Sequence, residues 1–227
     1  MITEFTEIFD EFLDTEIDSF DISKYSPPTL SKYLSNLLKR AREQVYNLLY
    51  KNSVIDINKM DDVVEFSNNE YDFSYTGITF TTTLNPIPIL NSDFYITVDN
   101  QETNISDYIY DSTLGQITIN NMTNALHSIN IISYINGHFN QNLSLIEKGI
   151  LVDWMGVFFL KDKIKSQRLY NITVYGVDYP EKSQANHLKA LESIYNENKH
   201  DAEVKTLEYT YRNDPTNLHD LGARGGM

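Results

Sequence analysis

A long segment without lysine or arginine, from residue 60 to residue 147, most constrains how this chain can fold. Inside it, apolar and polar side chains alternate with the period of two that β-strands require. On both sides of it, apolar residues recur every three or four positions, which is the period of helices. This change of period predicts an α+β fold, in which helices flank an antiparallel β part.

The first 22 residues predict an acidic amphipathic helix or arm. Phe5, Ile8, Phe9, Phe12 and Leu13 recur at helical spacing, and this stretch carries eight acids and no base. Such a segment is either a surface helix that covers the domain or an arm that docks on a basic partner surface.

A second helix is predicted from about Thr29 to Lys51, after a break that contains two prolines. Its leucines keep to one broad stripe. Basic residues occupy much of the remaining surface, and Lys39, Arg40 and Arg42 lie among them. This basic face is expected either to meet the acidic arm, in the same chain or in a neighbour, or to be solvated.

The base-free segment predicts a set of short strands, at residues 77–84, 93–98, 116–120 and 127–135. In the last of these, Ile129, Ile131 and Ser133 are expected on one face, with Ile132 and Tyr134 on the other. Short strands at this spacing predict an antiparallel β-sandwich or barrel. Pro86 and Pro88 indicate a turn or an edge strand.

The C-terminal third predicts a helix over about 141–165 that is apolar nearly all round, and is therefore either the centre of the fold or a subunit contact. Residues 169–179 are expected to be extended. A further helix is predicted over 180–198, then a final strand over 204–211 and an open tail from Asn213. These elements give four parts: a helical arm and helix (1–60), a β-sandwich (61–140), a helical and strand part that packs with the N-terminal helix (141–212), and an extended tail (213–227).

Composition narrows the function. Eighteen basic residues against thirty-two acidic give a net charge of −14, which disfavours general nucleic-acid binding. The absence of cysteine excludes disulfides, thiolate zinc sites and cysteine nucleophiles. The acid-interrupted opening does not fit a secretory signal, and no apolar stretch is long enough for a membrane span, so synthesis in a cytosol is expected.

No catalytic motif is apparent, so the protein is expected not to be an enzyme and to need no cofactor. The five histidines lack zinc-hydrolase spacing. Residues 99–104 offer oxygen ligands for calcium, but without the spacing or the glycine of a calcium loop. The sixteen tyrosines could stack on sugars, although a core or a subunit contact is the favoured interpretation.

Part of the chain resembles structural proteins of tailed-bacteriophage virions, specifically connector and baseplate components. The resemblance lies in Asp93-Phe-Tyr-Ile-Thr-Val-Asp99, in Asp107-Tyr108, in Gly115-Gln-Ile-Thr-Ile119 and in Ile132-Ser-Tyr134. The helix around Ser183-Gln-Ala-Asn-His-Leu188 and the later Leu207-Glu-Tyr-Thr-Tyr211 are similar to the C-terminal half of structural proteins from large phages of Gram-positive hosts. The resemblance covers roughly residues 90–212.

This resemblance implies a component of the head-to-tail connector, or neck, a ring between portal and tail through which DNA passes. Its partners would be further copies of itself, the portal and tail proteins, and DNA that slides past without specific binding; no membrane is expected, and the location would be the virion. The candidate subunit-contact residues are Phe5, Phe9, Phe12, Lys39, Arg40, Arg42, Trp154 and Phe158. The candidate channel-facing acids, which would repel DNA, are Asp99, Glu102 and Asp107.

Two other functions remain open. A baseplate or tail-fibre attachment protein would share the ring but sit at the far end of the tail. A β-sandwich carbohydrate-binding module would use tyrosine faces and act as a monomer. An enzyme would need convergent carboxylates with perturbed pKa values in a cleft, and nothing in the sequence indicates one.

Overall fold

The chain divides into two compact units, each with its own elements. The computed structural model describes residues 2–15, 22–50, 60, 62–85, 93–173 and 181–213. The helical unit combines residues 1–21, 34–64 and 138–227, and the β unit combines residues 22–33 and 65–137. The fold is α+β, as predicted. Its helices come from both ends of the chain, and most of its antiparallel strands lie between these helices in the sequence.

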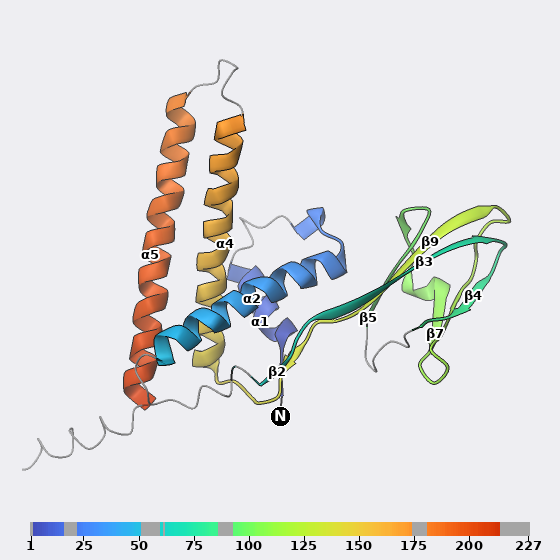
Figure 1. Cartoon of the computed structure of the whole chain (residues 1–227), viewed down its shortest axis with the longest axis horizontal. Helices are drawn as coiled ribbons and strands as arrows, with labels where there is room; N and C mark the ends of the chain where they lie inside the picture. Colours follow the sequence, from blue (N-terminus) through green and yellow to red (C-terminus); the bar gives the residue numbers. More distant parts are fainter. Residues whose placement is uncertain are drawn as a thin grey trace, which may run out of the picture. The chain divides into compact units, whose positions relative to one another are not determined.

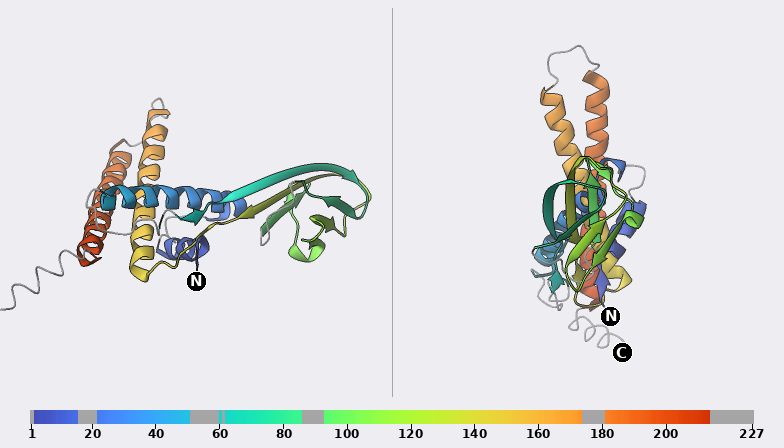
Figure 2. Two further views of the ribbon diagram at one scale, coloured as in Figure 1. Left: turned by 60° about the horizontal axis from the view of Figure 1, so that its bottom comes forward. Right: turned by 90° about the vertical axis from the view of Figure 1, so that its right-hand side faces the viewer.

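Within its described residues, the helical unit contains four α-helices and a small sheet (Figure 1). The helices are α1 (Phe5–Thr15), α2 (Pro27–Tyr50, in this unit from Leu34 on), α4 (Leu145–Thr173) and α5 (Glu181–Asn213). The sheet is antiparallel, in the order β1 (Thr3–Glu4), β10 (His138–Phe139), β2 (Val63–Val64). Helices α4 and α5 run side by side in the views of Figures 1 and 2.

Helix α4 is the centre of the helical unit. Besides Glu147, ten of its residues are buried, namely Ile150, Leu151, Val152, Trp154, Met155, Gly156, Val157, Phe159, Leu160 and Ile164. Their positions go all round the helix, which requires neighbours on most sides. Helix α1 supplies one neighbour, since its Phe12 ring meets Phe159 edge-on at 5.9 Å between centroids. This helix was predicted to be either the centre of the fold or a subunit contact, and its packing within the chain agrees with the first of these roles.

Helix α5 packs on α4 through a stripe of small residues. Ala202, Thr206 and Thr210 are buried at four-residue intervals, so one face of the helix can approach α4 closely. The Thr206 hydroxyl donates to the Ala202 carbonyl and accepts a hydrogen bond from the Trp154 indole at 3.0 Å. The buried indole N–H therefore has its partner.

The strand predicted over 204–211 is wrong, because these residues continue α5 to Asn213. Leu207, Tyr209 and Tyr211 recur at period two and, with Val204 before them, suggested a strand, but the buried positions follow the helical spacing of Ala202, Thr206 and Thr210. The extended segment predicted over 169–179 is also wrong in its first part, because α4 continues to Thr173. Residues 174–180 lie outside the described residues, as do Pro86, Pro88 and the predicted tail from residue 214 onwards.

The start of α4 is fixed by a capping box. Ser144 Oγ accepts from the Glu147 amide at 3.3 Å, and Glu147 accepts from the Ser144 amide at 2.6 Å. The other oxygen of this buried carboxylate accepts from the Tyr209 hydroxyl at 2.6 Å, which ties the end of α5 to the start of α4. Burial and this hydrogen bond raise the pKa of Tyr209 well above its usual range.

The β unit contains two antiparallel sheets. One has the order β3 (Ser67–Thr76), β9 (Leu126–Ile135), β5 (Asp93–Val98), β6 (Gln101–Glu102). The other has the order β4 (Phe80–Thr83), β8 (Gln116–Ile119), β7 (Tyr108–Asp111). Two short 3-10 helices, η1 (Ile22–Lys24) and η2 (Ile105–Asp107), and the first part of α2, up to Tyr33, also belong to the unit. Each sheet has two edge strands, so the barrel alternative is wrong for the described residues.

One apolar cluster takes residues from both sheets of the β unit. Tyr71, Ile96, Ile129 and Ile131 come from the first sheet, and Phe80, Ile117 and Ile119 from the second. The register places Tyr71, Ile131 and Ile96 in one row across three strands. Buried Ile129, Ile131 and Ser133 alternate along β9 as predicted.

Strands β3 and β7 were not predicted from the sequence. The ten residues of β3 are mostly polar, and they pair along their whole length with β9, from Ser67 opposite Ile135 to Thr76 opposite Leu126. The two strands run side by side in Figure 1. Only the aromatic positions Tyr71, Phe73 and Tyr75 mark the inner face, and they carry too weak an alternation to stand out.

Candidate functional site

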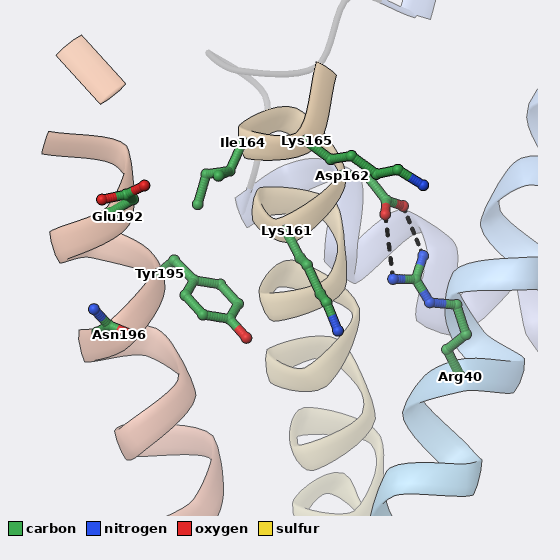
Figure 3. Close-up of a pocket in the computed structure, with 8 residues that line it drawn as sticks. All are labelled: Arg40, Lys161, Asp162, Ile164, Lys165, Glu192, Tyr195 and Asn196. Atoms are coloured by element: carbon green, nitrogen blue, oxygen red, sulfur yellow. Dashed lines mark hydrogen bonds and ion pairs between the residues drawn. The ribbon is translucent and has the colours of Figure 1, made fainter. Parts of the chain in front are cut away.

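The helical unit contains a cleft with a volume of about 700 Å³ (Figure 3). Three helices line it: α2 contributes Arg40, α4 contributes Lys161, Asp162, Ile164 and Lys165, and α5 contributes Glu192, Tyr195 and Asn196. Three cations against two acids leave a local charge of +1, in a chain whose net charge is −14. We call it the cationic cleft.

One wall of the cationic cleft is a bidentate ion pair. The Arg40 guanidinium donates two hydrogen bonds to the Asp162 carboxylate, at 2.6 and 3.2 Å, in the bidentate geometry that arginine favours (Figure 3). The same guanidinium lies over the Phe158 ring, 4.5 Å from its centroid. Because Arg40 is held twice, its charge is fixed in place and largely offset by Asp162.

The remaining cations of the cleft are Lys161 and Lys165. They stand four residues apart on α4, so their side chains emerge one helical turn from each other on the same face. Both residues are exposed. In Figure 3 the Tyr195 ring extends from α5 toward Lys161. The arrangement presents two ammonium groups to an incoming ligand, and its chemistry suits carboxylates or phosphates.

The cleft has the chemistry of a binding surface. Among the described residues, no group of three or more histidine, aspartate and glutamate side chains is placed to hold a metal ion. Lysines and a bound arginine attract anions, and the lining residues that the structure describes include no serine, threonine, cysteine or histidine. The lysines therefore suit the cleft to binding an anionic ligand.

The structure assigns most of the candidate subunit-contact residues a place inside their own chain. Phe5 and Phe12 are 0% exposed, and Phe9 is buried beside them. Phe5 contacts Phe139 at 5.0 Å between ring centroids. Trp154 is buried against Thr206. These side chains contribute to the core of the helical unit, and their role in subunit contacts stays a prediction.

The three predicted basic contacts have different surroundings. Arg42 is buried, and its Nε donates to the Met60 carbonyl at 2.7 Å. Arg40 and Phe158 come together at the cationic cleft, as described above. Lys39 is exposed. The exposed basic face of α2 is thus smaller than its sequence indicates. Lys161 and Lys165 of α4, which sequence reasoning did not single out, extend the basic surface next to Arg40.

The candidate channel-facing acids lie in three different local settings. Glu102 lies on the edge strand β6, opposite Thr97 of β5. Asp107 ends η2, where its carboxylate accepts from the Asn121 side chain at 3.2 Å. Asp99 begins a tight turn between β5 and β6, with positive φ at Asp99 (54°) and Asn100 (64°). Paired positive φ angles of this kind identify a two-residue hairpin turn that favours Asp and Asn.

Asp99 also holds a histidine that the sequence did not mark. One carboxylate oxygen accepts from the Ser128 amide at 2.9 Å, and the other lies 2.7 Å from Nδ1 of His127. Nε2 of the same ring lies 2.9 Å from the Thr123 carbonyl oxygen and 3.0 Å from the Thr123 hydroxyl. We call this group the His127 latch, since it ties the β5–β6 turn to the start of β9.

The His127 latch has the residue types of a catalytic triad but not its chemistry. A carbonyl oxygen only accepts hydrogen bonds, so Nε2 must carry a proton to bind Thr123. That nitrogen is then not available as a base for the Thr123 hydroxyl. The hydrogen bonds from His127 to Asp99 and Thr123 raise the pKa of His127. Those from Ser128 and His127 lower the pKa of Asp99. The geometry favours the doubly protonated ring.

We expect the β unit to lose stability as the pH rises through the pKa of folded His127. That pKa lies above the ordinary value of 6.5, so the contribution of the charged ring is complete below about 6.5 and is lost above the folded value. Asp99 contributes above its ordinary pKa of 3.8, and this part is lost as the pH falls through its lowered folded value. Urea unfolding across pH 5 to 9, with NMR titration of the His127 ring, measures the first effect, and its extension to pH values below 3.8 measures the second.

His127→Gln is the matched variant, because it keeps a polar side chain without a titrating ring. It should be less stable than the parent chain at pH 6 and should lose most of the dependence on pH between 6 and 9. A His127 ring that titrates at or below 6.5 in the folded protein would contradict the latch.

Four tyrosines of the β unit are turned toward its apolar cluster. Tyr71 belongs to the apolar cluster, and Tyr75, Tyr108 and Tyr110 pack against it. This placement agrees with the favoured prediction of a core role for these aromatic side chains.

Comparison with known proteins gives no further assignment. The chain matches no protein-family model, no curated protein and no solved structure at a significant level. Among the described residues, no helix combines the length and the apolarity that crossing a membrane requires.

Proposed function

We propose that the chain is a structural subunit of a tailed-phage particle and forms part of the head-to-tail connector ring through which DNA passes. The observation that carries this proposal is the resemblance of residues 90–212 to such proteins. In the β unit, the residues of that resemblance fall mainly on β5, β8 and β9, and those of its C-terminal part lie on α5. An attachment role also suits a cationic cleft lined by lysines, without a metal-binding cluster among the described residues.

We further propose that the two sheets of the β unit pack as a β-sandwich. The support is the single apolar cluster to which both sheets contribute, with Phe94 and Tyr110 rings 4.5 Å apart between centroids. In a connector, the base-free segment 65–137 of this unit would face the DNA path. Glu65, Glu70, Asp72, Asp93, Asp99, Glu102, Asp107 and Asp111 give residues 65–137 eight acids and no lysine or arginine. Such a surface repels phosphate and lets DNA slide.

Light scattering on the purified chain, alone and mixed with candidate portal or tail proteins, tests the proposal. We expect either a ring or a monomer that assembles only on a partner ring. Gold-labelled antibody against the chain should then mark the neck of the particle in electron micrographs. Label at the far end of the tail would identify a baseplate component instead. A monomer that joins no virion partner would contradict a structural role.

A further inference from the structure

The outer surface of α1 carries an acidic face made of Asp10, Glu11 and Asp14. At 100° per residue, these three lie on the side of the helix opposite the buried stripe of Phe5, Ile8, Phe9 and Phe12. All three acids are exposed. Within the part of the chain that the structure describes, none of them has an ion-pair partner, whereas Glu7 on the same helix is bound by Lys148.

The charges of the acidic face match those of the cationic cleft in spacing. Asp10 and Asp14 are four residues apart on α1, and Lys161 and Lys165 are four residues apart on α4. Side chains at this interval stand one helical turn apart, about 6 Å between Cβ atoms. Two helices that approach each other with these faces can therefore form two ion pairs at once.

We propose that the acidic face of α1 in one copy of the chain docks on the cationic cleft of a second copy. The acidic face cannot serve its own cleft in this way, because it is directed away from the residues that α1 packs against its own chain. The two surfaces are different, so the contact is heterologous, and repetition of it builds a ring or an open chain. This inference rests on the proposed ring assembly and names the surfaces that would form it.

A second copy suits the cleft better than nucleic acid does. The cleft carries a local charge of only +1, and the chain around it is strongly acidic, so a phosphate backbone would meet net repulsion. A partner helix presents two carboxylates at the four-residue spacing of Lys161 and Lys165, whereas phosphates follow one another continuously along a nucleic-acid backbone. At about 1 M salt the screening length falls to ~3 Å, so self-association should weaken sharply there.

Charge reversal on each side provides the test. The variants are Asp10→Lys/Asp14→Lys and Lys161→Glu/Lys165→Glu, and mass photometry of the full chain measures their self-association. Each variant alone should associate at least roughly tenfold more weakly than the parent chain, because each places like charges opposite each other. An equal mixture of the two should regain association, because acidic α1 then meets lysines and basic α1 meets glutamates.

Matched controls separate this contact from a general change in charge. Glu197→Lys/Asp201→Lys reverses two exposed acids at the same spacing on α5, and Lys189→Glu/Lys199→Glu reverses two α5 lysines outside the cleft. Both should associate as the parent chain does. In a mixture of ¹⁴N and ¹⁵N chains, carbodiimide should join Asp10 or Asp14 of one isotope to Lys161 or Lys165 of the other. Circular dichroism checks that every variant is folded.

Several outcomes would overturn the inference. Variants that associate as the parent chain does would place the contact elsewhere and leave the connector proposal standing. A parent chain that stays monomeric at every concentration, salt level and mixture with virion proteins would end both proposals. Loss of double-stranded DNA binding in Lys161→Glu/Lys165→Glu, with self-association unchanged, would make the cleft a phosphate site.

Discussion

Replacing Trp154 by alanine should lower the free energy of unfolding of the helical unit by about 3–5 kcal/mol. The indole is 1% exposed in the middle of α4, and its ring lies 6.1 Å from that of Phe158 between centroids. The substitution leaves a large cavity where α4 meets α5, and it removes the hydrogen bond to Thr206. Urea unfolding followed by circular dichroism at 222 nm measures the loss, since the variant has no tryptophan fluorescence.

Trp154→Phe is the matched control, because it keeps an aromatic ring and removes only the indole N–H and part of the volume. Thr206 would keep the hydrogen bond that it donates to the Ala202 carbonyl, so no buried hydroxyl is left without a partner. We expect a loss of about 1–2 kcal/mol for this variant. A loss below about 1 kcal/mol for Trp154→Ala would show that α4 is not the centre of the helical unit.

Replacing Ile131 by alanine should lower the stability of the β unit by about 2–5 kcal/mol. Ile131 is 0% exposed on β9, between Tyr71 of β3 and Ile96 of β5 in the same row. A cavity at this point removes contacts to both neighbouring strands. Hydrogen exchange should therefore speed up along β3, β5 and β9, while the amides of α4, which belong to the other unit, keep their protection.

Ile132→Ala is the control for this prediction, since it removes the same atoms from the adjacent residue of the same strand. Ile132 faces the opposite side of the sheet and is only half-buried. Its loss should be less than about half of that at Ile131, because less apolar surface returns to water. Equal losses at the two positions would contradict the alternation that defines the inner face of β9.

The binding chemistry of the cationic cleft depends on side chains from distant parts of the sequence, so no single segment predicts it. Arg40 and Asp162 are 122 residues apart in the chain, and their pairing leaves Lys161 and Lys165 as the cations that the cleft offers. The acids predicted to face a channel include one, Asp99, whose carboxylate is engaged in the His127 latch. A test of DNA passage in the proposed connector therefore belongs at Glu102, since a change at Asp99 also breaks a turn.

The sequence by itself determined the fold class, the existence of α1, α2 and α4, and the two faces of β9. These elements have strong local periods: Phe5, Ile8, Phe9 and Phe12 recur at helical spacing, and Ile129 and Ile131 alternate at strand spacing. A period of this kind specifies which face is buried whatever the partner is.

Three features were decided only by the tertiary structure: that residues 67–76 form a strand, that α5 continues to Asn213, and that most of the predicted contact residues are buried in their own chain. The polar strand β3 forms because it pairs with β9 along all ten of its residues. Helix α5 continues to Asn213 because Thr206 and Thr210 fit against α4. Hydrogen bonding and packing with distant segments outweigh weak local preferences. The sequence also could not show that Phe12, Arg42 and Trp154 are buried in their own chain. An apolar stripe that covers a core has the same sequence pattern as one that contacts a neighbouring subunit, and only the packing distinguishes them.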